Sequence, residues 1–224
     1  MGAASRPATD SVRNTPPIIH AVTDEATLAR PDFVARARVV MGRLGARGAV
    51  HLRGHHVSAR RLEVLAGALV EEAVRTGCWL VVNDRLDIAL AVGATAVQLT
   101  SRSLSVRDAR QLAPALPIGA SIHDADEAAA AARDGADWVV AGHVFATPSH
   151  IGAPPRGSAL VESIAARASL PCIAIGGVRP VDIPMLLAAG AHGVAAIRGI
   201  WGADDAEGAA GEYLSAYDGE RHRN

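Results

Sequence analysis

Two glycine-containing segments near the C-terminal end of the chain have the residue types of an anion site. Gly176-Gly177 and Arg198-Gly199 each follow a short apolar run. Glycines let the main chain approach a phosphate closely, and their N–H groups then meet its oxygens without interference from side chains. Arg198 adds a fixed charge and a forked donor that suits phosphate oxygens. We therefore expect these four residues to bind a phosphate group, the alternative being a tight turn beside a surface arginine.

Ser121 and His123 alternate at the end of another apolar run, Ile118–Ile122. Side chains two residues apart in a strand point to the same side, so both would face the same space. Imidazole gains and loses a proton near neutral pH, and a histidine at a strand end can therefore act as a general acid or base. A hydrogen-bonded structural histidine is the alternative interpretation.

Other polar residues also follow apolar runs. His51 and Arg53 share one face at the end of one run, and Asn83 ends the next. Four histidines would then lie near one end of the fold, namely His20, His51, His123 and His143. Their spacing contains no His-x-His or His-Glu-x-x-His pattern, and few carboxylates lie nearby. We therefore expect no metal site.

Eight short runs rich in Val and Ile carry these residues at their ends, and such runs are typical of strands buried on both faces. The runs are Ile18–Thr23, Ala49–Arg53, Trp79–Asn83, Ala96–Leu99, Ile118–Ile122, Trp138–Gly142, Cys172–Gly176 and Gly193–Ile197. Helical stretches separate them. A glycine stands between a helical stretch and a strand at Gly48, Gly93, Gly135 and Gly190, where it would end the helix in the left-handed conformation.

Eight alternating strand–helix units with no break in composition predict an α/β fold, a single (β/α)8 TIM barrel over residues 18–217. An open doubly wound sheet is the alternative, but the segment after the first strand, residues 23–26, lacks the Gly-x-Gly-x-x-Gly turn. In a barrel the strand ends meet at one mouth, and the loops after strands 7 and 8 usually bind phosphate. We expect a disordered leader over residues 1–17 and a flexible tail over residues 218–224.

The composition excludes several classes of protein. With 22 basic and 23 acidic residues and a net charge of -1, no basic field is available to hold a nucleic acid. The longest charge-free stretch, residues 138–155, contains Gly, Pro and His, so we expect no membrane partner. The chain contains no lysine, which excludes Schiff-base chemistry through that residue. Cys78 and Cys172 belong to no Cys-x-x-Cys pair and are expected to be reduced core residues of a cytoplasmic protein.

Five motifs at the strand ends recur in one family in this order and spacing. They are Ala21-Val22-Thr23-Asp24, Leu52-Arg53, Asn83-Asp84-Arg85-Leu86-Asp87-Ile88-Ala89, Ile118-Gly119 with Ser121 and His123, and Ala174-Ile175-Gly176-Gly177. Over residues 18–200 the chain thereby resembles the barrels of the thiamine-phosphate synthase and thiazole tautomerase superfamily. The resemblance implies the TIM-barrel fold and a phosphorylated small-molecule substrate.

The synthase branch of this superfamily needs magnesium, and the chain departs from its pattern. The branch usually has Arg-x-Lys after strand 2, where this chain has Arg53-Gly54-His55. Its second magnesium carboxylate, after strand 4, is replaced by Ser103, and its Thr-x-Thr-Lys segment reads Thr147-Pro148-Ser149-His150. Asp84 remains, and one carboxylate holds magnesium poorly.

The TenI-type branch, the thiazole tautomerases, is more similar. It shares Val97-Gln98-Leu99 with Ser101 and Ser103 after it, Gly142-His143-Val144-Phe145 and Arg156-Gly157. Two positions differ from this branch, because Arg198 stands where a small serine is common and Asp84 where glycine can stand.

The resemblance to the tautomerase branch implies an isomerase of thiamine biosynthesis. It would convert a thiazole carboxylate phosphate tautomer to its aromatic form with His123 as the catalytic proton carrier, without a cofactor, as a homodimer. The residues implied for the rest of the substrate are Arg53, Asn83, Ser101, Ser121 and His143. A histidine at position 123 also occurs among synthases, so two alternatives stay open: a Mg-dependent thiamine-phosphate synthase, and a non-catalytic regulatory barrel that binds thiazole or thiamine phosphate.

Overall fold

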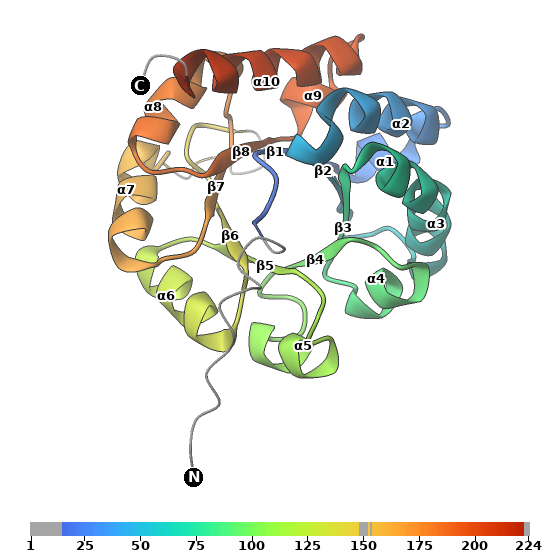
Figure 1. Ribbon diagram of the computed structural model, residues 1–224, viewed down its shortest axis with the longest axis horizontal. Helices are drawn as coiled ribbons and strands as arrows, with labels where there is room; N and C mark the ends of the chain where they lie inside the picture. Colours follow the sequence, from blue (N-terminus) through green and yellow to red (C-terminus); the bar gives the residue numbers. More distant parts are fainter. Residues whose placement is uncertain (1–14, 148–151, 153, 222–224) are drawn as a thin grey trace.

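The chain folds into a closed barrel of eight parallel strands surrounded by helices (Figure 1). The computed structural model describes residues 15–147, 152 and 154–221. Neighbouring strands pair in chain order, and β1 pairs with β8 to close the ring. The predicted TIM barrel is therefore confirmed. The strands are β1 (Ile19–Val22), β2 (Gly48–Leu52), β3 (Trp79–Asn83), β4 (Ala96–Leu99), β5 (Ile118–Ile122), β6 (Trp138–Ala141), β7 (Cys172–Ile175) and β8 (Gly193–Ala196).

Helices follow each strand and cover the outside of the barrel. Short 3-10 helices are η1 (Gly45–Arg47) and η3 (Pro180–Asp182). The α-helices are α1 (Glu25–Ala29), α2 (Phe33–Leu44), α3 (Ala59–Thr76), α4 (Leu86–Val92), α5 (Val106–Leu112), α6 (Ala125–Asp134), α7 (Gly157–Arg167), α8 (Ile183–Ala188), α9 (Arg198–Trp201) and α10 (Ala206–Arg221).

The predicted strand boundaries agree with the structure to within one residue. Strands β3, β4 and β5 begin and end where expected, β1 and β2 differ at both ends, and β6, β7 and β8 differ at their C-terminal end. Arg53, for example, lies just beyond β2, because its N–H donates to the Thr23 hydroxyl at 2.8 Å rather than to a neighbouring strand. Polar residues that were expected at strand ends, such as Arg53, therefore lie at the start of the loops.

The predicted glycine helix ends are only partly correct. Gly93 and Gly135 do cap α4 and α6 in the left-handed conformation, and Gly190 has a φ of +97°. Gly48 is not left-handed: it follows the 3-10 helix η1 and begins β2 with extended backbone, whereas α2 ends at Leu44 and is capped by Gly45. Gly48 is instead needed for space, since a Cβ there would lie 2.2 Å from the Leu44 Cβ.

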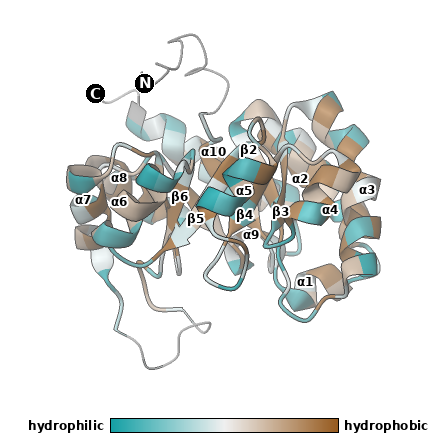
Figure 2. Ribbon diagram, turned by 90° about the horizontal axis from the view of Figure 1, so that it is seen from below, coloured by the Kyte–Doolittle hydropathy of each residue, from teal (hydrophilic) through white to brown (hydrophobic). Residues whose placement is uncertain are grey.

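Side chains alternate between two cores. The outward-facing side chains of the strands pack under the helices, whereas inward-facing ones such as Val81, Trp138 and Ile173 fill the barrel. Trp138 fits because Gly119 on the neighbouring strand has no side chain: a Cβ there would lie 2.2 Å from the indole ring. The helices turn hydrophilic residues outward, most visibly α5 in Figure 2. Among the described residues, the polar side chains that point into the barrel lie in its C-terminal half, with the exception of His20.

Described residues beyond both predicted ends of the barrel domain make contacts with it. Pro16 and Pro17, assigned to the leader, accept hydrogen bonds at 2.8 Å from His192 and His20, while residues 1–14 lie outside the described part. The predicted tail overlaps α10, which continues to Arg221. Arg47 holds this end of the helix by donating to Asp218 at 2.9 Å, and residues 222–224 are not described.

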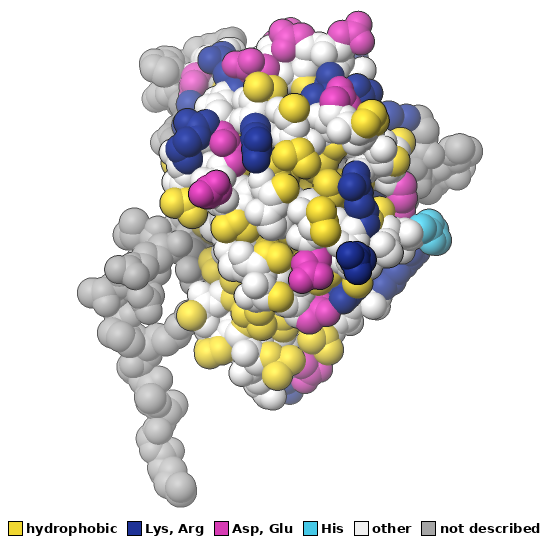
Figure 3. All heavy atoms as spheres, turned by 90° about the vertical axis from the view of Figure 1, so that its right-hand side faces the viewer, with side chains coloured by type: hydrophobic (Ala, Val, Ile, Leu, Met, Phe, Trp, Pro, Cys, Tyr) yellow, Lys and Arg dark blue, Asp and Glu magenta, His cyan; other side chains and the backbone are white. Residues whose placement is uncertain are grey.

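The outer surface offers no membrane-spanning helix within the described part of the chain. Figure 3 faces the side where α1 to α4 lie and shows hydrophobic side chains between arginines and carboxylates. Exposed apolar residues of these helices include Val64 and Val74 on α3 and Leu90 on α4. The homodimer stays a prediction.

Candidate active site

A pocket of about 450 Å³ opens among the C-terminal ends of the strands. Its lining comes from strands all around the barrel and from the loops that follow them. Every residue that the sequence predicted for the site lines this one pocket, namely Arg53, Asn83, Ser101, Ser121, His123, His143, Gly176, Gly177, Arg198 and Gly199. The roles given to these residues stay predictions, but their convergence follows from barrel geometry, which the sequence pattern did indicate.

The main chain forms one side of the pocket after β7. Gly176 and Gly177 have φ values of +103° and +68°, which glycine adopts without strain. A Cβ on Gly177 would lie 2.5 Å from the Ala146 carbonyl oxygen, so the loop after β7 packs directly on the loop after β6. Two hydrogen bonds join these loops, from the Val144 and Phe145 N–H groups to the Ile175 and Gly176 carbonyls. The resulting turn exposes main chain to the pocket.

Helix α10 supports this turn from below. The Tyr213 hydroxyl donates to the Val178 carbonyl at 2.8 Å, and burial raises the pKa of this tyrosine to about 12. The same hydroxyl would lie 2.2 Å from a Cβ on Gly199, so glycine at that position makes room for it. One buried side chain therefore holds the loops after β7 and β8 together. Above them, the Arg198 guanidinium donates to the Thr147 hydroxyl at 3.2 Å.

His123 is oriented by the first turn of the helix that follows it. Asp124 caps α6 by accepting from the Glu127 N–H at 2.8 Å. Glu127 in turn accepts from the His123 N–H at 2.6 Å and lies 3.2 Å from the ring Nδ1. The Nδ1–H donates to this carboxylate, so Nε2 is left as the proton acceptor of the neutral ring. The histidine side chain is 57% exposed, which leaves it open to the pocket.

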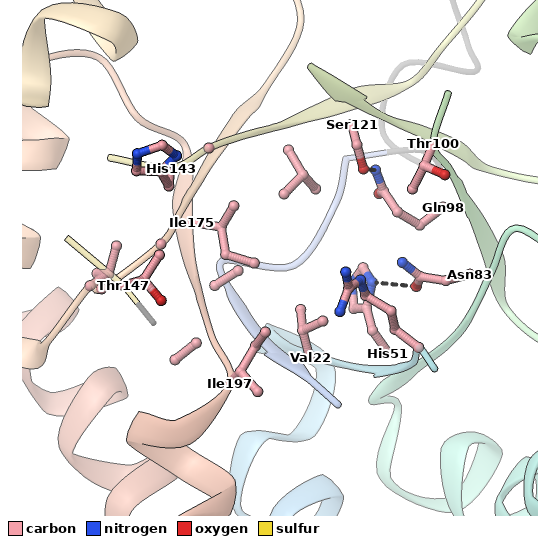
Figure 4. A pocket seen from close by; sticks show the side chains of 18 of the residues that line it. Val22, His51, Asn83, Gln98, Thr100, Ser121, His143, Thr147, Ile175 and Ile197 are labelled. Atoms are coloured by element: carbon pink, nitrogen blue, oxygen red, sulfur yellow. Dashed lines mark hydrogen bonds between the residues drawn. The ribbon is translucent and has the colours of Figure 1, made fainter. Parts of the chain in front are cut away.

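The opposite side of the pocket is built from buried polar side chains of β2 to β5. His51, Asn83 and Gln98 are each less than a tenth exposed. His51 contacts the Asn83 amide at 3.2 Å, and Gln98 donates to the Ser121 hydroxyl at 3.1 Å (Figure 4). Figure 4 shows His143 and Thr147 across the pocket, with Ile175 between them and the polar group. His143 is also buried and donates from Nε2 to the Pro154 carbonyl at 3.1 Å.

The sequence reasoning missed several basic residues of the pocket. Arg102, Arg179 and His55 also line it. The Arg53 guanidinium donates to the His55 Nε2 at 2.6 Å, and burial followed by the charges of Arg53 and Arg102 lowers the pKa of His55. Arg102 and Arg179 could have been found, because each lies only a few residues beyond a predicted strand.

The charged residues that line the pocket are all basic. Among the described lining residues are four arginines and four histidines, and no aspartate or glutamate. The described part of the chain also has no group of three or more His, Cys, Asp or Glu that could hold a metal ion. This set of donors suits an anionic ligand.

Magnesium, which the synthase branch needs, does not fit the two positions expected to bind it. The Asp84 carboxylate accepts from the Thr100 N–H and hydroxyl at 3.0 and 2.7 Å and is not among the residues that line the pocket. The Ser103 hydroxyl donates to the Thr100 carbonyl at 2.9 Å. Both side chains therefore stabilise the turn after β4, and magnesium prefers carboxylate ligands.

Comparison with known proteins places the chain in a family. The family model described as thiamine monophosphate synthase, TMP-TENI, matches residues 19–200. Thiamine-phosphate synthases of Methanoculleus marisnigri and Chlorobium luteolum are each 39% identical to it, over 86% and 87% of this chain and 91% and 90% of theirs. The solved structure of thiamine phosphate pyrophosphorylase from Pyrococcus furiosus is similar with a TM-score of 0.81 and 29% identity, covering 93% of this chain and 98% of that one. The chain belongs to the TMP-TENI family of thiamine biosynthesis.

Proposed function

We propose that the protein is a thiazole tautomerase, an isomerase that converts a thiazole carboxylate phosphate tautomer to its aromatic form. The observation that carries the proposal is the pocket lining, which is rich in arginine and histidine and contains no carboxylate among the described residues. Such a lining suits a substrate with anionic groups and a reaction that moves a proton. It offers little to a reaction that needs magnesium on a leaving pyrophosphate.

The proposed reaction transfers one proton within the substrate. The ring carbon next to the carboxylate loses its proton to His123 Nε2, and the electron pair of that C–H bond enters the ring. The double bonds shift to make the ring aromatic, and the exocyclic alkene carbon takes a proton from the imidazolium. Glu127 stabilises the imidazolium that forms, through its contact with Nδ1. No electrons are gained or lost, so no redox cofactor takes part.

The remaining predicted residues hold the substrate. The main chain at Gly176, Gly177 and Gly199 and the guanidinium of Arg198 bind the phosphate in this proposal. Arg53 and Ser101 on the opposite rim bind the carboxylate, and His143, Asn83 and Ser121 contact the ring. We further propose a cytoplasmic location and a homodimer, as expected from the sequence.

A second candidate is thiamine-phosphate synthase itself. It is favoured by the names of the curated relatives, which are 39% identical over most of the chain. The chain lacks lysine altogether, and Asp84 and Ser103 are engaged in the turn after β4. This candidate would therefore have to act with arginine alone on the pyrophosphate.

A paired turnover assay on the purified protein separates the candidates. One reaction contains the unaromatised thiazole carboxylate phosphate and is followed for the aromatic product. The other contains the pyrimidine pyrophosphate, the thiazole phosphate and Mg²⁺ and is followed for thiamine phosphate. Acceleration of the first alone supports the tautomerase. Product in the second alone establishes the synthase, and tight binding of the phosphates with no turnover in either establishes a regulatory barrel.

A further inference from the structure

A chain of polar contacts crosses the barrel interior from its N-terminal end to the floor of the pocket. His20 on β1 is fully buried, and its Nε2 lies 2.8 Å from the Pro17 carbonyl oxygen. Its Nδ1 lies 2.8 Å from His51 Nε2. His51 Nδ1 lies 3.2 Å from the amide of Asn83, and both His51 and Asn83 line the pocket. The proposed reaction uses neither histidine.

The Pro17 carbonyl fixes the position of every proton along this chain. A carbonyl oxygen only accepts, so His20 Nε2 must carry a hydrogen. A neutral imidazole has one N–H, which makes His20 Nδ1 an acceptor and requires the hydrogen of His51 on Nε2. His51 Nδ1 then has no hydrogen. It can only accept a hydrogen bond from Asn83.

Protonation of either histidine would change the positions of these hydrogens. Burial opposes protonation of both rings. Burial lowers the pKa of His20 to about 4; the hydrogen bond to Pro17 opposes this shift, and the nearby His192 adds to it. Burial and the neighbouring His20 also lower the pKa of His51 well below its ordinary value. Both rings are therefore neutral at pH 7.

The Asn83 oxygen faces His51 Nδ1 in the structure. With the protons assigned above, two hydrogen-bond acceptors would then lie opposite each other. A half-turn of the amide puts its nitrogen there as a donor, and the oxygen then takes the other position. Figure 4 shows this other end of the amide beside the atom that contacts His51, and Asn83 lines the pocket. We infer that His20 and His51 fix the Asn83 amide with its oxygen toward the pocket, where it accepts a hydrogen bond from a ligand N–H or O–H.

The inferred acceptor makes Asn83 a specificity-determining residue, whichever reaction the pocket carries out. Ser121 accepts from Gln98, so its own O–H is available as a donor to a ligand. The floor thus offers an acceptor from β3 and a donor from β5. If a ligand faced Asn83 with an unprotonated ring nitrogen or an ether oxygen, two hydrogen-bond acceptors would lie opposite each other without a hydrogen between them. Sites of this kind discriminate strongly against such ligands.

Nitrogen NMR of the wild-type protein tests the inference directly. In ¹⁵N-histidine-labelled protein at pH 7, long-range ¹H–¹⁵N correlations report which ring nitrogen carries the proton. We expect His20 and His51 both to be protonated on Nε2 only. A His51 ring with its hydrogen on Nδ1, or on both nitrogens, would overturn the inference without any need for a variant.

A pair of variants then tests whether His20 sets the order. In His20→Leu the His51 Nε2–H loses its acceptor, and we expect the hydrogen to move to Nδ1 and donate to the Asn83 oxygen. His192→Leu is the matched control, because His192 also donates to a proline carbonyl, that of Pro16, whereas the ring contacts of His51 are with His20 and Asn83. Retention of the Nε2–H form in His20→Leu, or the same change in both variants, contradicts the assigned role of His20.

Discussion

The two sides of the pocket are built in different ways. On the side of β1 to β4, buried side chains such as His51 and Asn83 contact one another and are ordered before any ligand arrives. On the side of β5 to β8, the lining includes glycine main chain and exposed groups such as His123 and Arg198, beside the buried His143. The first side is suited to recognise the shape and hydrogen-bond pattern of a ligand, and the second to meet its charge and reacting atoms. Substitutions on the two sides should therefore have different consequences.

Removal of the imidazole from the β5 side should have the largest effect. We expect His123→Ala to lower kcat by about 10²–10⁴-fold, the usual contribution of a positioned acid or base, with little change in product affinity. His56→Ala is the matched control, since His56 is exposed and does not line the pocket. Steady-state kinetics and calorimetric titration of the product measure the two quantities. Full activity of His123→Ala would remove this residue from the mechanism.

The charge at the β8 loop should contribute to binding more than to rate. We expect Arg198→Met to raise KM about tenfold or more while kcat changes less, because a phosphate is bound alike in the ground and transition states. Hydrogen bonds to charged groups contribute about 1.5–3 kcal/mol, which sets this range. Arg60→Met, an exposed arginine on α3, serves as the control. An unchanged KM would place the phosphate elsewhere.

The packing of the loop after β7 can be tested by adding one methyl group at a glycine. Gly177 and Gly93 have nearly the same φ, +68° and +71°, but only at Gly177 would a Cβ meet another group, the Ala146 oxygen at 2.5 Å. Gly93→Ala should destabilise the protein by about 1 kcal/mol through backbone strain alone. Gly177→Ala should cost about 1–3 kcal/mol more through the contact and should also weaken phosphate binding. Thermal unfolding of both variants checks this prediction. Equal losses of stability would mean that the loop after β7 is not tightly packed on the loop after β6.

The buried histidine His20 should make the free energy of unfolding depend on pH. Burial lowers the pKa of His20 from 6.5 to about 4, so between these values the unfolded chain binds a proton that the folded protein does not. The free energy of unfolding therefore falls as the pH falls from about 6.5 to 4, by at most about 1.4 kcal/mol per pH unit for this group. In His20→Leu this contribution is absent, and the slope should be smaller. Urea unfolding at pH 7, 6 and 5 measures it; parallel slopes would contradict the assignment.

The barrel and the membership of its pocket were predictable because both depend on local patterns. Apolar runs such as Ala96–Leu99 and Ile118–Ile122 gave strand positions directly, and parallel strands of a barrel bring their C-terminal ends together. Gly48 was misinterpreted because a glycine required for space has the same signature as one required for a positive φ. Only the three-dimensional packing against Leu44 distinguishes the two.

The connections between site residues could not be predicted, because they join positions far apart in the chain. Nothing in the sequence indicates that His20 contacts His51, 31 residues later, or that the Tyr213 hydroxyl reaches the Val178 carbonyl. Nor does the sequence show that Thr100 donates two hydrogen bonds to one carboxylate oxygen of Asp84. Such contacts depend on side-chain directions at the barrel mouth, which periodicity does not specify.

The position of Tyr213 has a consequence for the order in which the protein is completed during synthesis. All eight strands precede α10 in the chain, so the ring of strands can form while α10 is still inside the ribosome. The loops after β7 and β8 acquire their common support only when Tyr213 emerges and inserts beneath them. A nascent chain halted before this residue would hold every predicted substrate-binding group and yet lack a firm anion site. The common support of the two loops therefore forms after the strands, once α10 has been synthesised.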